Sequence, residues 1–580
     1  MVAVFWQDDR VEMAGRVDMP GTSSRTGRRA GGWLLLLLLA GCSGGRSSPC
    51  PQTGEYQWRG LLAGPGEDDF DGELARVARQ RDRQFWALHA LPLGLNAELA
   101  IDRGKAEVRQ AVERFLREQE GWDFTAASGL DPVTVVDSWW SAVGAYAGAG
   151  IAADAFRYGV LRDQCYPAEE VERARAQLLR ALDGLHLALE VTGTPGVIAR
   201  GLLRRDYPGG GDVTTVELFD EQGNPLPAEK DNGTWRADQS GRHPEIVWVD
   251  SCSRDMLIGW VLGFGAAWEV IAADADIADA VRQRLRADAR ALADNLRTVR
   301  PNGYDLELLD ADGRTTYHGY LNENNLDRLY IDGSRNGFHA IMALGIMAAL
   351  AYIVDDAGLD DYLYDELIHR RRLAVIAREN SIVLNLDNVT NFSNYNMAFA
   401  GAWLALRHLR REESARDDVL QALEVQLFDT PGKEFQPAQF GNAFYDLVTV
   451  AGRCRAAAGQ ACTQVPDEAL LARMRQTLQE FPRPPFWEFA RENCDAQEIA
   501  AGSCLAEDGQ TVLTVLGEVG RGGALLVAEP LPMRLRPPSN YYWRSSPYQP
   551  NGGSDGPNLY PGPDFRLAYW AARWIRRVEP

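Results

Sequence analysis

Two kinds of helix-forming segment alternate along this chain, and the alternation limits the folds that the chain can adopt. Six segments are apolar on all sides, and they cover residues 135–161, 253–273, 335–356, 394–409, 441–459 and 564–575. A helix of that kind must be buried on every side. Six other segments are amphipathic and highly charged, as surface helices are, and they cover residues 69–91, 169–190, 278–299, 360–380, 411–428 and 466–481.

A ring of buried helices inside a ring of surface helices satisfies this alternation. The sequence therefore predicts an all-α fold over residues 67–580: an (α/α)6 toroid with parallel inner helices and outer helices that run back. A helical bundle or an α-solenoid is the competing arrangement. Small β-hairpin insertions are predicted near residues 213–237, 304–319 and 511–528, and Asp312-Gly313 marks one of the turns.

The N-terminus is typical of an exported protein. Basic residues at positions 25, 28 and 29 precede a short apolar run over residues 33–39, which cannot span a bilayer. Residues 39–42, Leu-Ala-Gly-Cys, resemble the lipobox of bacterial lipoproteins. The resemblance implies a signal peptide over residues 1–41, palmitate and related lipid on Cys42, and an outer-membrane location because Ser43 follows. An ordinary secretory signal is the alternative. Residues 42–66 are rich in Gly, Ser and Pro and predict a flexible tether.

Charge and cysteine content narrow the choice of partners. A formal net charge of −21 argues against nucleic-acid binding, which needs basic patches. With Cys42 acylated, seven cysteines remain, so at least one thiol is unpaired within the chain. Cys454 with Cys462, and Cys494 with Cys504, are the natural local disulfides. The sequence predicts no metal site and no cofactor, because no His lies at zinc spacing and no glycine-rich phosphate loop follows a strand.

Polar residues crowd the starts of the apolar segments, most clearly in WVDSCSRDMLIGW at residues 248–260. One helix needs only one cap. If the inner helices are parallel, their N-termini open on the same end of the toroid and the spare polar groups converge there. The residues expected at that end are Asp137, Asp250, Asp332, Asn396, Asp446 and Asp564. The pattern predicts a binding funnel; for any single residue the alternative is a cap or a satisfied buried polar group.

Aromatic faces beside carboxylates, amides and guanidiniums are what a sugar ring requires, because its C–H faces stack and its hydroxyls take directional hydrogen bonds. The funnel is therefore predicted to bind an oligosaccharide or polysaccharide. The candidate catalytic residues are Asp250, Asp255, Asp446 and Asp564. The candidate substrate-binding residues are Trp139, Trp140, Arg200, Arg254, Arg335, Tyr395, Asn396, Tyr445 and Arg544.

The segments at residues 137–161, 185–202, 248–269 and 563–574 resemble a group of bacterial secreted proteins of six-hairpin toroid type. The resemblance covers residues 65–580, and the wider class includes glycoside hydrolases and polysaccharide lyases. A hydrolase needs two carboxyls across the scissile bond, whereas a lyase needs a Tyr or His base with an Arg or Asn that neutralises a uronate. Both remain open, as does a non-catalytic glycan-binding or envelope-scaffold lipoprotein. Two carboxyls about 5–10 Å apart in an open cleft would favour a hydrolase. A funnel whose opening is filled by the protein itself would favour the non-catalytic scaffold role.

The lipobox yields the first prediction. Replacing Cys42 with Ala removes the thiol that would be acylated, so Cys42→Ala should move the protein from the membrane fraction to the soluble fraction. Fractionation and intact-mass analysis of the mature N-terminus measure this. Unchanged fractionation, together with an N-terminus that carries no lipid mass in the wild type, would contradict the lipoprotein interpretation.

Overall fold

A computed structural model describes residues 59–102, 104–118, 121–226, 233–326, 328–383, 388, 390–430 and 435–578. The predicted signal peptide, Cys42 and most of the predicted tether lie outside these ranges. The chain divides into two units, Met1–Pro49 and Cys50–Pro580, and every described residue belongs to the second. Helices make up 49% of the structure and strands make up 10%. The structure is therefore rich in helix and has small sheets, as the sequence predicted.

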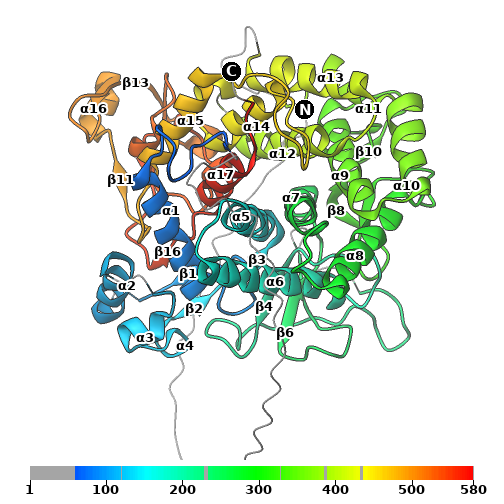
Figure 1. Cartoon of the computed structure of the whole chain (residues 1–580), viewed down its shortest axis with the longest axis horizontal. Helices are drawn as coiled ribbons and strands as arrows, with labels where there is room; N and C mark the ends of the chain where they lie inside the picture. The colour runs from blue at the N-terminus through cyan, green and yellow to red at the C-terminus, as the bar shows by residue number, and fades with distance from the viewer. Residues whose placement is uncertain are drawn as a thin grey trace, which may run out of the picture. The chain divides into compact units, whose positions relative to one another are not determined.

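Six helices, here called the inner helices, are buried along nearly all of their length. They are α5 (Gly144–Asp163), α7 (Arg254–Ile271), α9 (Gly337–Val354), α12 (Phe392–His408), α14 (Ala443–Arg453) and α17 (Pro563–Trp574). Each inner helix contacts the next one along the chain, and the last, α17, contacts the first, α5. The contacts therefore form a closed circuit, and Figure 1 shows these helices with the other helices around them.

The outer helices precede the first inner helix or lie between successive inner helices in the sequence. They are α1 (Gly72–Gln84), α6 (Ala168–Glu190), α8 (Asp279–Arg297), α11 (Leu373–Glu379), α13 (Glu413–Ala422) and α15 (Glu468–Glu480). The further helices are α2 (Ala106–Glu118), α3 (Phe124–Ser128), α4 (Pro132–Val135), α10 (Ala357–Asp361) and α16 (Ala496–Ala501). Each of the first six packs on an inner helix: α1 on α17, α6 on α5, α8 on α9, α11 on α9, α13 on α12 and α15 on α14.

Glycines let neighbouring inner helices approach closely. Between α5 and α7, a Cβ atom added at Gly148 would lie 1.7 Å from the carbonyl oxygen of Gly259. Between α9 and α12, a Cβ at Gly345 would lie 2.2 Å from the carbonyl oxygen of Gly401. These backbones touch with no side chain between them, which explains why the apolar segments are rich in small residues.

A buried ion network ties the last inner helix to the start of the fold. Arg566 of α17 donates from Nε to Asp82 of α1 at 2.7 Å and from Nη2 to Asp154 of α5 at 2.5 Å. Trp570 donates from Nε1 to the second oxygen of Asp82 at 3.0 Å. The side chains of Arg566, Asp82 and Asp154 are at most 1% exposed. The contact between α17 and α5 is therefore held by charge as well as by apolar packing.

Short strands form small sheets between the helices. The sheets are β1 (Leu99–Ala100) with β2 (Ser138–Trp139) and β16 (Asn558–Leu559); β3 (Ala142–Val143), β4 (Gly201–Arg204), β6 (Ile246–Val249) and β5 (Trp235–Ala237); β7 (Glu307–Leu309) with β8 (Thr315–Tyr320); β9 (Asn325–Leu326) with β10 (Leu329–Tyr330); β11 (Arg491–Glu492) with β15 (Asn551–Gly552); and β12 (Ser503–Leu505), β13 (Val512–Gly517) and β14 (Leu526–Val527). The strands of each of these sheets pair antiparallel.

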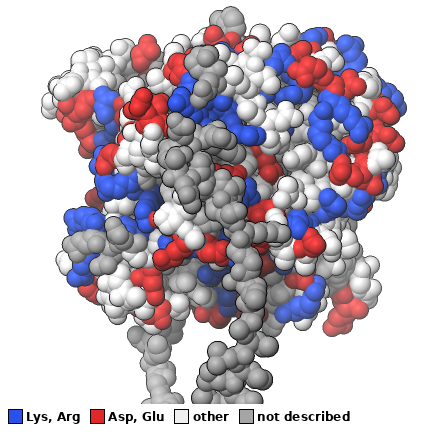
Figure 2. Space-filling model, viewed as in Figure 1, with Lys and Arg blue, Asp and Glu red and all other residues white. Residues whose placement is uncertain are grey.

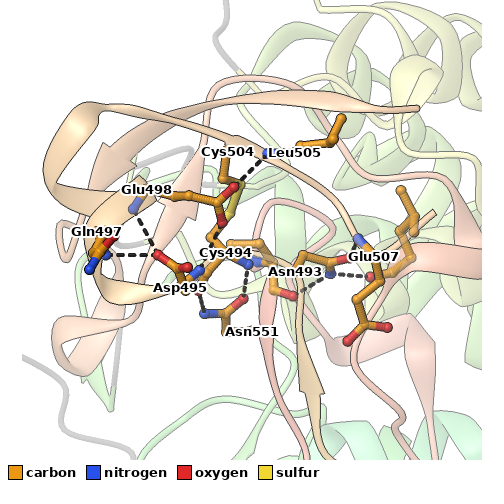
Figure 3. Close-up of a disulfide and its surroundings, with 11 residues drawn as sticks. Asn493, Cys494, Asp495, Gln497, Glu498, Cys504, Leu505, Glu507 and Asn551 are labelled. Carbon is orange, nitrogen blue, oxygen red and sulfur yellow. Dashed lines mark hydrogen bonds between the residues drawn. A yellow bond between two sulfur atoms is a disulfide. The ribbon is translucent and has the colours of Figure 1, made fainter. Parts of the chain in front are cut away.

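Both predicted local disulfides are confirmed, Cys454 with Cys462 and Cys494 with Cys504. Figure 3 shows the second of them beside Asn551, whose side chain accepts from the Cys494 N–H and donates to the Cys494 carbonyl. Among the described residues, Cys252 is the free cysteine and is buried. An unpaired thiol was expected from the odd number of cysteines.

Several predicted segments differ from the observed elements. The helix expected over residues 135–161 begins only at Gly144, because residues 138–139 and 142–143 pair as strands with residues 99–100 and 201–202. The outer helix expected over residues 360–380 is interrupted at Arg372, which has φ 59°. At the other end of the chain, Leu61 was expected in the tether, yet its N–H donates to the Ile575 carbonyl at 2.9 Å. The packed chain therefore starts earlier than residue 67.

Ion pairs join the outer helices on their exposed side. Figure 2 shows acidic and basic side chains interspersed over the region of α10, α11 and α13. Arg378 of α11 pairs with Asp418 of α13, and Arg455 pairs with Asp417 at 2.7 Å. In the described part of the chain, one helix, α9, is long and apolar enough to cross a bilayer. Because α9 is almost fully buried, its composition is that of a core helix.

The glycine contacts yield the second prediction. Gly148→Ala places a methyl group against the Gly259 carbonyl, so α5 and α7 must separate, and the free energy of unfolding should fall by about 1–3 kcal/mol. Gly150→Ala is the matched control on the same helix, because its Cβ would lie 3.4 Å from the nearest atom, in the Phe85 ring. Urea denaturation of both variants measures the difference. Equal losses in the two variants would contradict the proposed close contact.

Candidate functional site

The N-terminal ends of the inner helices meet around residues 541–543, and this region is here called the entrance. The Tyr541 hydroxyl donates to the Ala145 carbonyl of α5 at 3.5 Å. The side chain of Asn396 on α12 lies beside this hydroxyl. The Tyr146 and Tyr541 rings lie 4.2 Å apart between centroids. One tyrosine thus joins the starts of two inner helices that are far apart in sequence.

The next two residues bind the starts of α17 and α14. The Tyr542 N–H donates to Asp564 at 2.8 Å, and the Tyr445 hydroxyl donates to the Trp543 carbonyl at 2.9 Å. Tyr541, Tyr542 and Trp543 are 2–4% exposed. Aromatic side chains of this segment therefore fill the centre of the entrance.

The starts of α7 and α9 reach the same end through other contacts. The Ala145 N–H of α5 donates to the sulfur of Met256 on α7 at 3.4 Å. The Arg254 guanidinium lies 5.8 Å from the centre of the Phe338 ring on α9. All six N-termini are therefore linked, directly or through residues 541–543.

Asp250 and Asp310 form a buried acidic pair beside α7. Asp250 accepts from Nε of Arg236 at 2.7 Å and from the Thr234 N–H at 2.6 Å, and Asp310 accepts from the Ser251 N–H at 2.7 Å. Burial raises the pKa of Asp250. Burial and the Asp250 charge raise the pKa of Asp310 to about 7. The two carboxyls hold a β-strand and a helix start together.

Asp446 and Asp564 are also buried and bonded within the protein. Asp446 is 0% exposed and pairs with Arg473 of α15, which donates from Nε at 3.1 Å. Asp564 accepts from the backbone N–H groups of Tyr542 and Phe565. Burial raises the pKa of each carboxyl to about 6. Both acids therefore have structural partners in this arrangement.

Asp255 differs from the other three acids because it is only partly buried. Its carboxylate accepts a hydrogen bond from the Ser253 hydroxyl, and Ser253 in turn accepts from Nη1 of Arg200 at 2.7 Å. Arg200, Ser253 and Asp255 thus form a chain of polar contacts that leads from β4 to the first turn of α7. Asp255 is the candidate acid that solvent reaches.

Glu98 is a partly buried acid at the entrance that the sequence analysis did not single out. Asn540 donates to its carboxylate, and burial raises the pKa of Glu98 whereas the Arg544 charge lowers it. Burial also raises the pKa of Tyr146, and so do the charges of Glu98, Asp255 and Asp564. The only sequence signal is one acid within the apolar stretch 91–101.

The predicted aromatic residues fall into two groups. Trp139 is fully buried, and its Nε1 donates to the Leu88 carbonyl at 2.8 Å. Trp140 is 43% exposed, and its backbone N–H donates to the Glu98 carbonyl at 2.8 Å. Tyr395 and Tyr445 are buried in the aromatic packing around α12. Trp140 is therefore the aromatic residue that a ligand near Glu98 would meet.

The remaining predicted residues are Arg335, Asp137 and Asp332. Asp332 is exposed and accepts from the Tyr304 hydroxyl at 2.6 Å. Arg335 is exposed and pairs with Glu379 at the end of α11, at 3.3 Å. Asp137 pairs with Lys105 and precedes α5 by seven residues instead of capping it. In the described part of the chain no hydrogen bond or ion pair joins these residues to residues 541–543. The structure thus places Arg544 over the Tyr146 ring and Trp140 beside Glu98, and it keeps Asp250, Asp446 and Trp139 in the interior.

Comparison with known proteins does not assign the chain to a family. No protein-family model matches the chain, and no curated protein matches it. In the described part of the chain, no three His, Cys, Asp or Glu side chains are arranged to hold a metal ion. The residues of the site are therefore the basis for its proposed chemistry.

The acidic pair beside α7 yields a pH prediction. An unfolded Asp loses its proton near pH 4, but folded Asp310 keeps its proton to about pH 7. Its contribution to the free energy of unfolding therefore falls as pH rises between these values. Asp310→Asn keeps an oxygen for the Ser251 N–H and cannot ionise. Between pH 4 and pH 8 the free energy of unfolding of Asp310→Asn relative to wild type should rise by up to roughly 4 kcal/mol, since each unit of pKa shift is worth about 1.4 kcal/mol.

Urea denaturation at several pH values measures this shift. The exposed Asp279→Asn on α8 serves as the control and should show a difference from wild type that does not depend on pH. A pH-independent difference for Asp310→Asn as well would contradict the shared burial of Asp250 and Asp310.

Proposed function

We propose that the inner and outer helices form an (α/α)6 toroid and that the chain is a lipoprotein anchored through Cys42 in the bacterial outer membrane. The closed circuit from α5 through α17 and back to α5 supports the toroid. An α-solenoid would leave its first and last helices apart. The lipobox at residues 39–42 supports the anchor.

We further propose that the entrance binds a glycan and that Glu98 and Asp255 act as the two carboxyls of a glycoside hydrolase. One observation carries this proposal: Glu98 and Asp255 are only partly buried, whereas Asp250, Asp446 and Asp564 are buried, and Asn540, next to residues 541–543, donates to Glu98. Trp140 beside Glu98 offers an exposed aromatic face for a sugar ring. Arg544 and Asn396 add hydrogen-bonding groups near Tyr146 and Tyr541.

The two acids have environments that suit different roles. Burial raises the pKa of Glu98, which favours a protonated carboxyl that can act as the general acid. Asp255 is more open and accepts from the Ser253 hydroxyl, which suits the base or nucleophile. A lyase would instead need a tyrosine that loses its proton. Burial and the neighbouring acids raise the pKa of Tyr146, so the lyase reaction is disfavoured here.

A non-catalytic glycan-binding or scaffold role is the second candidate. The filling of the entrance by residues 541–543 favours it, as do the pairs of Asp250 with Arg236 and Asp446 with Arg473. This role would keep a shallow binding surface around Trp140 and Arg544 but would have no turnover. The two candidates therefore predict the same ligand class and differ in the fate of the bound glycan.

A screen of neutral and acidic oligosaccharides tests the proposal. Reducing-end release measures hydrolysis, and isothermal titration measures binding. Glu98→Gln and Asp255→Asn should each reduce the rate of hydrolysis by at least about a hundredfold with a melting temperature close to that of wild type. Glu113→Gln on outer helix α2 is the control for loss of one acid and should keep wild-type activity.

The outcomes separate the two candidates. Binding without release of reducing ends, weakened when Trp140 is replaced by Ala, would establish the non-catalytic role. A wild type that neither binds nor cleaves any glycan, with Asp255→Asn that only melts earlier, would contradict both.

A further inference from the structure

A cavity of about 330 Å³ lies at the opposite end of the inner helices from the entrance. Asp163 at the end of α5, Glu269 near the end of α7, Arg407 near the end of α12 and Trp574 at the end of α17 line it. The entrance lies at the other ends of these helices. Since α5 has 20 residues and a helix rises about 1.5 Å per residue, the two places are roughly 30 Å apart.

The charges that line the cavity balance one another. Arg162 donates to Asp163 at 2.6 Å and to Asp274 at 2.7 Å, and Arg407 pairs with Glu269. With Arg576, the lining residues include three guanidiniums and three carboxylates. A charged ligand would add an uncompensated charge to this balanced lining, which is unfavourable in a partly buried site.

Glu269 has spare capacity to accept a hydrogen bond. Its Oε1 accepts from Arg407, from Nε1 of Trp574 at 2.6 Å and from the Gly459 N–H at 3.3 Å. Its side chain is 1% exposed, and among the residues that the structure describes none donates to Oε2. Oε2 is not one of the fully enclosed polar atoms that lack a partner, and Glu269 lines the cavity, so Oε2 is reached from the cavity. A ligand hydroxyl in the cavity would satisfy it without adding charge.

We propose that this cavity binds a neutral, hydroxyl-bearing ring the size of a monosaccharide, with one hydroxyl donating to Glu269 Oε2. Paired planar guanidinium and carboxylate groups, together with the Trp574 indole, are groups that hydrogen-bond and pack against sugar rings. The volume falls at the lower end of the range for small-molecule sites. This site does not rest on the function proposed for the entrance.

Isothermal titration of the full-length chain in detergent tests the proposal with a matched set of probes. D-glucose, D-galactose, D-mannose and N-acetyl-D-glucosamine are neutral, whereas D-glucosamine and D-glucuronate carry one positive and one negative charge. At least one neutral sugar should bind at least tenfold more tightly than either charged sugar. No binding by the neutral sugars, or tighter binding by a charged one, would overturn the proposal.

Substitutions then locate the bound sugar. Ala273 is exposed on the cavity rim and belongs to none of the ion pairs, so Ala273→Trp should block the cavity and weaken binding at least tenfold. Ala280→Trp, on the exposed side of α8, is the control and should bind as wild type does. Glu269→Gln should also weaken binding. If that variant fails to fold because Arg407 loses its partner, Ala273→Trp still tests whether the sugar binds in the cavity.

The entrance variants distinguish this site from the proposed function. Asp255→Asn should leave binding in the cavity unchanged. Binding of a neutral sugar that Asp255→Asn abolishes and Ala273→Trp leaves intact would assign the sugar to the entrance and would overturn the cavity proposal.

Discussion

The burial of six helices that have no polar face is the constraint on which the rest of this structure depends. Such a helix must be covered on every side. Along the chain, α5 and α17 are the first and last inner helices, so each would lack one neighbour unless the two packed together. Their contact supplies that neighbour, and the Arg566 pairs with Asp82 and Asp154 hold it. Glycines such as Gly148 and Gly345 let the helices approach closely enough.

The same constraint explains why so many acids gather at the entrance. Several helix starts converge there, and each brings unpaired N–H groups and a positive dipole end that favour carboxylates. Asp564 accepts from two backbone N–H groups, and Asp250 accepts from the Thr234 N–H and from Arg236. These acids hold the backbone near the entrance in place through hydrogen bonds inside the protein. Glu98 and Asp255 are only partly buried, and the proposed chemistry is therefore placed on them.

Sequence periodicity predicted the elements well where burial is uniform. It located all six inner helices, two of which begin at the asparagine caps Asn336 and Asn442. It failed where the structure depends on contacts between distant residues. Trp139 was expected at a helix start but pairs as a strand with Leu99. Glu98 was missed because only the folding of residues 540 and 544 onto it gives it a role. The cavity beside Glu269 was missed because helix C-termini carry no comparable polar signature.

Native-state hydrogen exchange tests the closed arrangement of the inner helices most directly. In a closed ring each inner helix depends on two neighbours, so the slowest amides of α5 and α17 should open with the same free energy as those of α9, close to that of global unfolding. In an open solenoid the terminal helices fray independently of the central ones. Equal opening free energies in α5, α9 and α17 are the predicted result. Markedly easier opening of α5 or α17 than of α9 would contradict ring closure.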